Sequence, residues 1–279
     1  MILDDLTAAV AKRLVEDKAR VSLSEMKERA LAAPKKEGFP FEHNLKQKGL
    51  SFICEVKKAS PSKGLIAPDF PYEAIAREYE QAGAAAISVL TERDYFLGSP
   101  KYLQDIAAAV QTPVLRKDFI IDEYQIYEAR AIGASAVLLI CAILDDERLK
   151  CFFELADSLG LSALVEAHDE TEVLRAIKAG ARIIGVNNRN LKDFTVSLDT
   201  SFRLRTLVPD DILFVAESGI KTGEHTKSLY DHGADAVLIG ETLMRSPDKK
   251  AALAELAAGT RGKGIVLRPQ AALRHRLGQ

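Results

Sequence analysis

The sequence has no tryptophan and only three cysteines among its 279 residues. The cysteines, Cys54, Cys141 and Cys151, are odd in number and form no Cys-x-x-Cys, which excludes a disulfide framework and a zinc site. Cys54 and Cys141 lie inside apolar runs, so we expect them to be small buried hydrophobic residues. The five histidines show no ligand spacing, and we predict no metal site.

The sequence also lacks an excess of charge of one sign and any long apolar run. Its formal net charge of −2 argues against nucleic acid or an anionic membrane as the main partner. No apolar run approaches the roughly 20 residues that a membrane-spanning helix needs. The first residues, Met1-Ile-Leu-Asp-Asp, carry acids where a signal peptide has bases. We therefore expect a cytoplasmic protein that binds neither nucleic acid nor membrane.

What the sequence does contain is one short motif in four near-copies, centred on Gly83, Gly133, Gly180 and Gly233. Each glycine is followed by alanine, follows a helix-like segment and leads into a short apolar run. The spacing of about 50 residues fits two βα units of a parallel sheet rather than a solenoid repeat. We expect each glycine just beyond a helix, where positive φ favours glycine, and each run to be a buried parallel strand.

From residue 51 onward, apolar runs alternate with helical patterns. The predicted strands are Ser51–Lys57, Ala85–Leu90, Pro113–Lys117, Ala136–Cys141, Ser162–Glu166, Ile183–Asn187, Ile212–Glu217 and Ala236–Gly240. The predicted helices are Tyr72–Gln81, Pro100–Ala109, Glu123–Ile132, Asp145–Leu159, Glu170–Ala179, Thr200–Leu207, Gly223–Asp231 and Asp248–Ala257. This alternation predicts an α/β fold, a (β/α)8 TIM barrel. The main alternative, a doubly wound sheet, would begin with a Gly-x-Gly-x-x-Gly turn after the first strand, and none is present.

Residues 1–50 precede the alternation and are predicted to form an N-terminal helical extension. Apolar residues with helical spacing there are Leu3, Leu6, Val10, Leu14 and Val15. A second short helix is expected over Ser24–Ala32, ended by Pro34 and Gly38, with Pro40 extending the loop. We expect residues 1–279 to form a single barrel domain, with a basic, flexible tail over 259–279.

Charged and polar side chains stand at the carboxyl ends of five predicted strands, where the active site of such a barrel forms. They are Glu55, Lys57, Lys117, Glu166, Asn187, Arg189 and Glu217. Glu55 and Lys57 are two residues apart and point to the same side of the sheet. Structural ion pairs, such as Lys117 with Glu166, would explain any one of these residues. Five strands converging on one mouth favour lysine and carboxylate acid–base chemistry instead.

The last two strands end in glycines, at Ser218-Gly219 and at Gly240. In barrels these loops present backbone N–H groups to a phosphate, and glycine allows a close approach. Two ordinary tight turns are the structural alternative. Together with the strand-end charges, this pair predicts a small phosphorylated substrate. Phe96 and Phe119 follow two other strands, and they either enclose a substrate ring or simply pack under a loop.

Several longer motifs occur in a recognisable order. They are Glu55-Val-Lys57-Lys-Ala-Ser60-Pro-Ser-Lys-Gly, Leu-Thr-Glu-Arg-Asp-Tyr-Phe96-Leu-Gly-Ser, Leu-Arg-Lys117-Asp-Phe119-Ile-Ile-Asp, Leu-Val-Glu166-Ala-His, Gly-Val-Asn187-Asn-Arg189-Asn-Leu191 and Ala-Glu217-Ser218-Gly219-Ile. Together they resemble the indole-3-glycerol phosphate synthase family, from the extension to about Gly259. The resemblance implies a (β/α)8 barrel with an extra N-terminal helical segment. It implies conversion of 1-(2-carboxyphenylamino)-1-deoxyribulose 5-phosphate to indole-3-glycerol phosphate for tryptophan biosynthesis, with loss of carbon dioxide and water and without a cofactor.

The resemblance also implies roles for individual residues. Lys117 is the expected general acid at the ketone, and Glu166 and Lys57 are expected to serve the later proton transfers. Glu55 and Asn187 would orient the lysines and substrate hydroxyls. The expected substrate contacts are Ser60, Phe96, Phe119, Leu138, Arg189, Leu191 and Glu217, and the expected phosphate contacts are Ser218, Gly219, Gly240 and Glu241. Glu241 is unusual beside a phosphate, so its side chain is expected to turn away and its N–H to contribute.

Three other functions remain as alternatives. One is another phosphate-binding barrel enzyme, such as phosphoribosylanthranilate isomerase, which needs a cysteine–aspartate pair at strand ends where this chain has Glu-Val-Lys. The second is an aldolase that forms a Schiff base on Lys57 or Lys117. The third is an inactive barrel that serves as a binding module. We expect a monomer or a weak homodimer whose partner is the small phosphorylated substrate.

Overall fold

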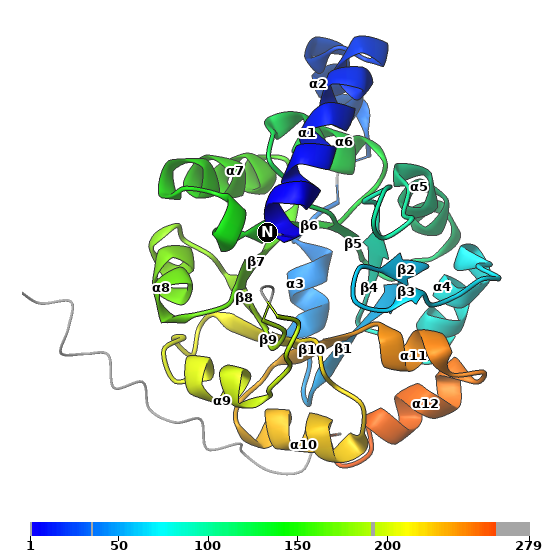
Figure 1. Ribbon diagram of the computed structural model, residues 1–279, viewed down its shortest axis with the longest axis vertical. Coiled ribbons are helices and arrows are strands. Elements are labelled where there is room, and N and C mark those ends of the chain that lie inside the picture. The colour runs from blue at the N-terminus through cyan, green and yellow to red at the C-terminus, as the bar shows by residue number, and fades with distance from the viewer. Residues whose placement is uncertain (1, 35, 191–192, 261–279) are drawn as a thin grey trace, which may run out of the picture.

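The computed structural model describes residues 2–34, 36–190 and 193–260, and its centre is a closed barrel of eight parallel strands (Figure 1). The strands are β1 (Ser51–Val56), β4 (Ala86–Leu90), β5 (Val114–Lys117), β6 (Ala136–Ile140), β7 (Ser162–Ala167), β8 (Ile183–Asn187), β9 (Leu213–Glu217) and β10 (Ala236–Ile239). Neighbours in the chain are neighbours in the barrel, and β10 pairs with β1 to close it. The TIM-barrel prediction is confirmed, and each strand agrees with its predicted range to within one residue at either end.

Helices surround the strands on the outside (Figure 1). They are α4 (Tyr72–Gln81), α5 (Pro100–Ala109), α6 (Glu123–Ala131), α7 (Asp146–Ser158), α8 (Glu170–Lys178), α9 (Asp199–Arg205), α10 (Gly223–Asp231) and α12 (Lys249–Leu256). The four repeated glycines follow α4, α6, α8 and α10 with φ of 88° to 90°. Their positions confirm the prediction that they lie just beyond helix ends. Glycine suits these positions because an L-residue with a side chain is strained at such φ.

The expectation of a loop at Pro40 was wrong, because Pro40 begins the short helix α3 (Pro40–Leu45). Proline suits the first turn of a helix, where its missing N–H has no helical partner to lose. Phe41 and Leu45 on α3 are buried among inward-facing residues such as Ile53 and Leu115. Figure 1 shows α3 within the ring of strands, so this helix fills the barrel at the end from which the strands begin.

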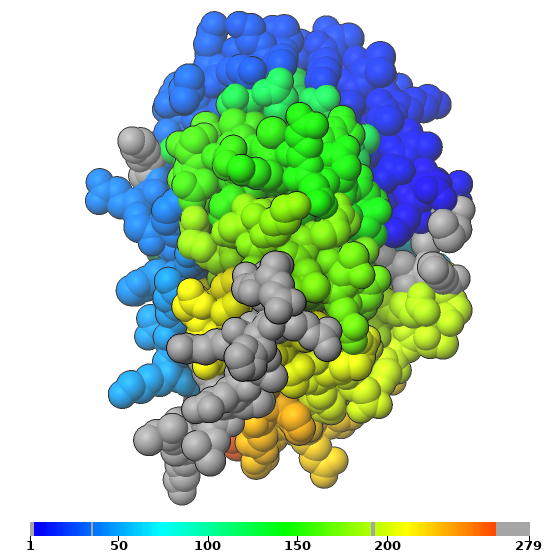
Figure 2. Space-filling view, turned by 90° about the vertical axis from the view of Figure 1, so that its left-hand side faces the viewer, coloured from blue at the N-terminus to red at the C-terminus, as the bar shows by residue number. Residues whose placement is uncertain are grey.

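The two helices before α3 are α1 (Ile2–Arg20) and α2 (Leu23–Ala32), and Figure 2 shows this blue segment over the top of the molecule. The helix α2 packs against α6. Ion pairs join α1 to the barrel, from Lys18 to Asp122 at 2.7 Å and from Arg93 to Asp17 at 3.1 Å. Val15 does not belong to the buried stripe of α1, because it is 72% exposed.

The sequence analysis did not predict four short elements. The strands β2 (Ala59–Ser60) and β3 (Gly64–Leu65) form a small hairpin after β1, η1 (Cys141–Ile143) follows β6, and α11 (Glu241–Arg245) follows β10. Cys54 and Cys141 are buried as expected. No helix of the described residues is long and apolar enough to cross a membrane. Most of the predicted tail, residues 261–279, lies outside the described residues.

Candidate active site

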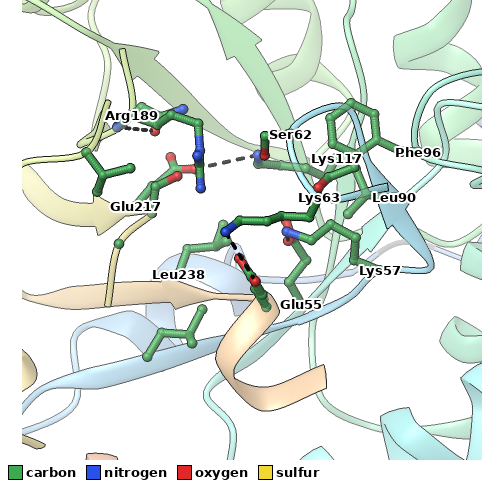
Figure 3. A pocket seen from close by; sticks show the side chains of 18 of the residues that line it. Glu55, Lys57, Ser62, Lys63, Leu90, Phe96, Lys117, Arg189, Glu217 and Leu238 are labelled. Atoms are coloured by element: carbon green, nitrogen blue, oxygen red, sulfur yellow. Dashed lines mark hydrogen bonds and ion pairs between the residues drawn. The ribbon is translucent and has the colours of Figure 1, made fainter. Parts of the chain in front are cut away.

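A cavity of about 760 Å³ opens at the carboxyl ends of the strands. Figure 3 shows Glu55, Lys57, Lys117 and Glu217 around it. Every predicted site residue among the described ones lines this cavity: Glu55, Lys57, Ser60, Phe96, Lys117, Phe119, Leu138, Glu166, Asn187, Arg189, Glu217, Ser218, Gly219, Gly240 and Glu241. Leu191 lies outside the described residues. The strand ends therefore bring together residues that are as far apart in the chain as Glu55 and Glu241.

Lys117 lies at the end of β5, between two buried carboxylates. Its Nζ is 3.9 Å from Glu166 Oε2 and 3.7 Å from Glu217 Oε2. Both distances exceed those of a good hydrogen bond, so neither carboxylate holds the ammonium tightly. Burial alone would lower the pKa of Lys117, but the nearby carboxylates outweigh burial and raise the pKa above its usual value. Lys117 is therefore a stable cation whose protons remain available to a bound molecule.

Glu217, at the end of β9, lies against a position that has no side chain. A Cβ built on Gly185 of β8 would come within 2.2 Å of Glu217 Oε1, so glycine there leaves the space that the carboxylate fills. Glu217 Oε1 is buried without a hydrogen-bond partner among the described residues. Burial and the charge of Glu166 raise the pKa of Glu217. Glu217 therefore takes a proton more readily than Glu55 or Glu166, whose pKa values are lowered.

Glu166, at the end of β7, has a different environment. Asn187 Nδ2 of β8 donates to its Oε1 at 3.2 Å. Burial would raise the pKa of Glu166, but its contacts with His168 and Lys117 prevail and lower it. The pKa of Glu166 is thus lowered while that of Glu217, in the same cavity, is raised. Opposite shifts of this kind are typical of paired acid and base groups.

Glu55 and Lys57 of the β1 end form a close pair, with 2.5 Å between Lys57 Nζ and Glu55 Oε2. Burial would raise the pKa of Glu55, but Lys57 lowers it. A Cβ on Gly240 would lie 2.2 Å from Glu55 Oε2 and 2.7 Å from Lys57 Nζ. The ammonium of Lys57 therefore lies against the backbone at Gly240.

The glycine rim of the cavity, defined by Ser218, Gly219 and Gly240, is formed by turns that favour glycine. Ser218 and Gly219 have φ of 69° and 79°. Gly240 precedes α11. The first N–H groups of any helix have no partner within the helix, and no side chain caps those of α11. The side chain of Glu241 runs along α11, where its Oε1 accepts from Arg245 Nε at 3.1 Å, and it lies 3.7 Å from Lys63 Nζ.

The relatives of this sequence agree with the geometry of the site. A profile of the indole-3-glycerol phosphate synthase family matches residues 3–256. The chain is 59% identical over 256 residues to the indole-3-glycerol phosphate synthase of Ruminiclostridium cellulolyticum, covering 92% of this chain and 98% of that protein. It is 57% identical to the corresponding enzyme of Endomicrobium trichonymphae, covering 92% and 99%. This chain belongs to the indole-3-glycerol phosphate synthase family.

Solved structures of lower identity share the fold alone. The 3-hexulose-6-phosphate synthase of Salmonella typhimurium superposes with a TM-score of 0.62 at 15% identity, over 76% of this chain and 98% of that one. Thiamine phosphate pyrophosphorylase from Pyrococcus furiosus gives 0.58 at 19% identity, over 76% and 95%. The family membership therefore rests on the sequence matches, and the barrel is common to other enzymes.

Several residues that line this cavity were not predicted from the sequence. The N-terminal helix contributes Leu3 and Leu6 to the cavity wall. Their helical spacing predicted a buried face but not what it faces. Leu90, Ile140 and Leu238 also line the cavity. Their positions at the carboxyl ends of strands were a usable signal for this.

The aromatic wall of the cavity consists of Phe96 and Phe119, whose ring centroids are 6.1 Å apart. The turn that carries Phe96 is organised by the buried Glu92, which the analysis also missed. Glu92 Oε2 accepts from the N–H of Tyr95 at 2.8 Å and of Phe96 at 2.9 Å, and Arg13 of α1 donates to Glu92 Oε1 at 2.6 Å. Glu92 therefore links the extension to the turn that carries Phe96.

Proposed function

We propose that this chain closes the indole ring of 1-(2-carboxyphenylamino)-1-deoxyribulose 5-phosphate, with Lys117 as the general acid. In the first step the ring carbon that bears the carboxylate attacks the ketone carbon. Negative charge then develops on the ketone oxygen, and a proton from Lys117 Nζ neutralises it. Lys117 suits this role because it is cationic and half-buried, and because its contacts with carboxylates are long. A positioned acid of this kind contributes a rate factor of roughly 10² to 10⁴.

The later steps are loss of carbon dioxide, which restores the aromaticity of the ring, and then loss of water. Dehydration needs a base and an acid. We assign the base to Glu166, whose pKa is lowered and which is therefore ionised. One of the two lysines, Lys57 or Lys117, protonates the leaving hydroxyl. Asn187 orients Glu166 through its amide, which lies 3.2 Å from the carboxylate.

The substrate phosphate is proposed to bind the glycine rim, with Lys57 supplying positive charge. The closeness of Lys57 Nζ to the Gly240 backbone supports this. The proposed N–H donors are at Gly219, Gly240 and Glu241. At the opposite side Phe96, Phe119 and Leu138 enclose the aromatic ring, and Ser60 and Arg189 face its carboxylate. Much of the catalysis is then positioning of a single flexible substrate.

The observation that carries this proposal is the loosely held Lys117 among buried carboxylates in a mouth that also has a glycine rim. The test is the growth of indole fluorescence when the purified protein meets the anthranilate-deoxyribulose phosphate substrate. We expect turnover without added metal or cofactor. A folded protein that gives no turnover contradicts the proposal. Borohydride added with substrate should leave no covalent adduct on Lys57 or Lys117, which excludes a Schiff-base route.

A further inference from the structure

A second layer of half-buried charged groups lies behind Glu166, and the proposed mechanism does not use it. His168 follows β7, and Glu172 lies one turn into α8. His168 Nδ1 is 3.0 Å from Glu172 Oε2, and the backbone N–H of His168 donates to the same oxygen at 2.8 Å. On the other side of the ring, Nε2 is 3.2 Å from Glu166 Oε1, which is the distance of an ion pair. This buried nitrogen has no aligned hydrogen-bond partner among the described residues, so its contact with Glu166 is one of charge. The imidazole thus lies between two carboxylates. Glu166 lines the cavity, whereas His168 and Glu172 lie behind it.

This placement determines the protonation state of the ring. A neutral imidazole carries a proton on only one nitrogen and would present a lone pair to the other carboxylate. Only the imidazolium places a proton toward each carboxylate. Burial would lower the pKa of His168, but the bonds to Glu166 and Glu172 prevail and raise it to about 10. The geometry and the direction of this shift agree on a cation at neutral pH.

The two carboxylate oxygens of Glu166 also have different neighbours. Oε1 faces His168 Nε2 and Asn187 Nδ2, each at 3.2 Å. Oε2 faces the cavity side, 3.9 Å from Lys117 Nζ. With Oε1 held, Oε2 remains free for a proton of the substrate.

We propose that His168 is a positioning residue for the reaction, which as an imidazolium anchored by Glu172 keeps Glu166 ionised and directs Glu166 Oε2 at the substrate. This inference rests on the proposed role of Glu166 as the base. Three carboxyl groups act on the ring directly: Glu166, Glu172 and Glu217. Beyond them, Lys117 acts on Glu166, and Cys141 and Arg175 act on Glu172. Of these, Glu166 and Glu172 contact the ring, so removing the imidazolium acts first on them.

The decisive variant is His168→Gln, which keeps an N–H donor within reach of Glu166 but removes the charge. We expect KM to stay near the wild-type value while kcat falls roughly 10- to 100-fold, less than a whole positioned base contributes. Loss of a neighbouring cation raises the pKa of Glu166. The acidic limb of the kcat profile should therefore move to higher pH. Glu172→Gln removes one of the two carboxylates that raise the pKa of His168, so the ring of that variant should lose its proton at a lower pH than in the wild type.

Two surface variants serve as matched controls. His232 is an exposed histidine that stacks on Phe202, and Glu170 is exposed on α8 and pairs with Arg203. His232→Gln and Glu170→Gln should leave kcat and its pH profile unchanged. A folded His168→Gln variant with an unshifted acidic limb contradicts the proposal. So does an equal loss of kcat in the His232 control.

A measurement on the wild-type protein makes the test independent of activity. Ring ¹⁵N chemical shifts of His168 at pH 8 should show both nitrogens protonated. A neutral tautomer at that pH overturns the proposal, even if the variant loses activity. Absence of wild-type turnover would instead refute the proposed function, and the nitrogen shifts would still decide the state of His168.

Discussion

Arg116 and Lys117 are neighbours on β5, but their positively charged side chains differ in how closely other groups bind them. Arg116 Nη1 is 2.7 Å from Glu128 Oε2, and Nη2 is 3.1 Å from Asp118 Oδ2. Further bonds reach the carbonyl of Gln125 and the hydroxyl of Thr91. Within the described residues, the ammonium of Lys117 forms ion pairs only with Glu166 and Glu217, and both are long. Arg116 is a buried cation whose donors are satisfied within the protein. Lys117 is half-buried, and its donors remain available to a bound molecule.

Arg116→Met should have the largest effect on stability, because it leaves the buried Asp118 and the half-buried Glu128 without their cation. Loss of one partner of a buried pair costs about 3–5 kcal/mol. We expect the free energy of unfolding in urea to fall by that amount, while kcat of the folded protein stays close to wild type. If Arg116→Met does not fold, Glu128→Gln gives the milder version. A large loss of kcat at full stability would erase the contrast with Lys117.

Gly185→Ala tests the space around Glu217. The new Cβ would overlap Glu217 Oε1 at 2.2 Å, so the carboxylate must move. We expect kcat to fall roughly 100-fold, as for a misplacement of about 1 Å, with an overpacking cost of about 1–3 kcal/mol.

The matched control for that prediction is Gly83→Ala, at one of the repeated glycines. Its Cβ meets nothing within 4 Å, but its φ is 89°. The variant should lose about 1–2 kcal/mol of stability through backbone strain and keep its kcat. Equal kcat values for the Gly185 and Gly83 variants would show that the space at Glu217 is not functional.

Glu217→Gln should change how stability depends on pH. The folded-state pKa of Glu217 is raised above its ordinary value of 4.5, so the folded protein keeps a proton that the unfolded chain releases. That contribution is complete below the ordinary pKa and is lost as pH rises through the raised one. It gives a slope of up to about 1.4 kcal/mol per pH unit. Urea unfolding from pH 5 upward should show this slope in the wild type and a flatter line in the variant.

Much of the barrel could be predicted from the chain alone because its signals are local. Apolar runs define the strands, and Gly83 and its counterparts mark the helix ends before them. Pro40 misled the prediction, because proline both breaks a helix and begins one, and only the packing of Phe41 inside the barrel decides which. Val15 likewise follows the helical spacing but lies on the exposed side.

The residues of the site also fall into those that the sequence predicts and those that it does not. Residues such as Glu55, Lys117 and Glu166 were predictable, because strand order alone brings their ends to one mouth. Gly185 and Glu92 were not, since their importance lies in what a different segment places against them. His168 stands in a quoted motif beside Glu166, but nothing in the sequence shows that Glu172 faces the far side of its ring.

The most direct test of the contrast between Arg116 and Lys117 is Lys117→Met, with kcat and the free energy of unfolding measured on the same preparation. Methionine keeps the length of the side chain and removes its protons. We expect indole fluorescence to appear at least 100-fold more slowly, in line with the loss of a general acid, while the free energy of unfolding changes little. A variant that unfolds, or that keeps its kcat, would show that Lys117 serves the structure as Arg116 does.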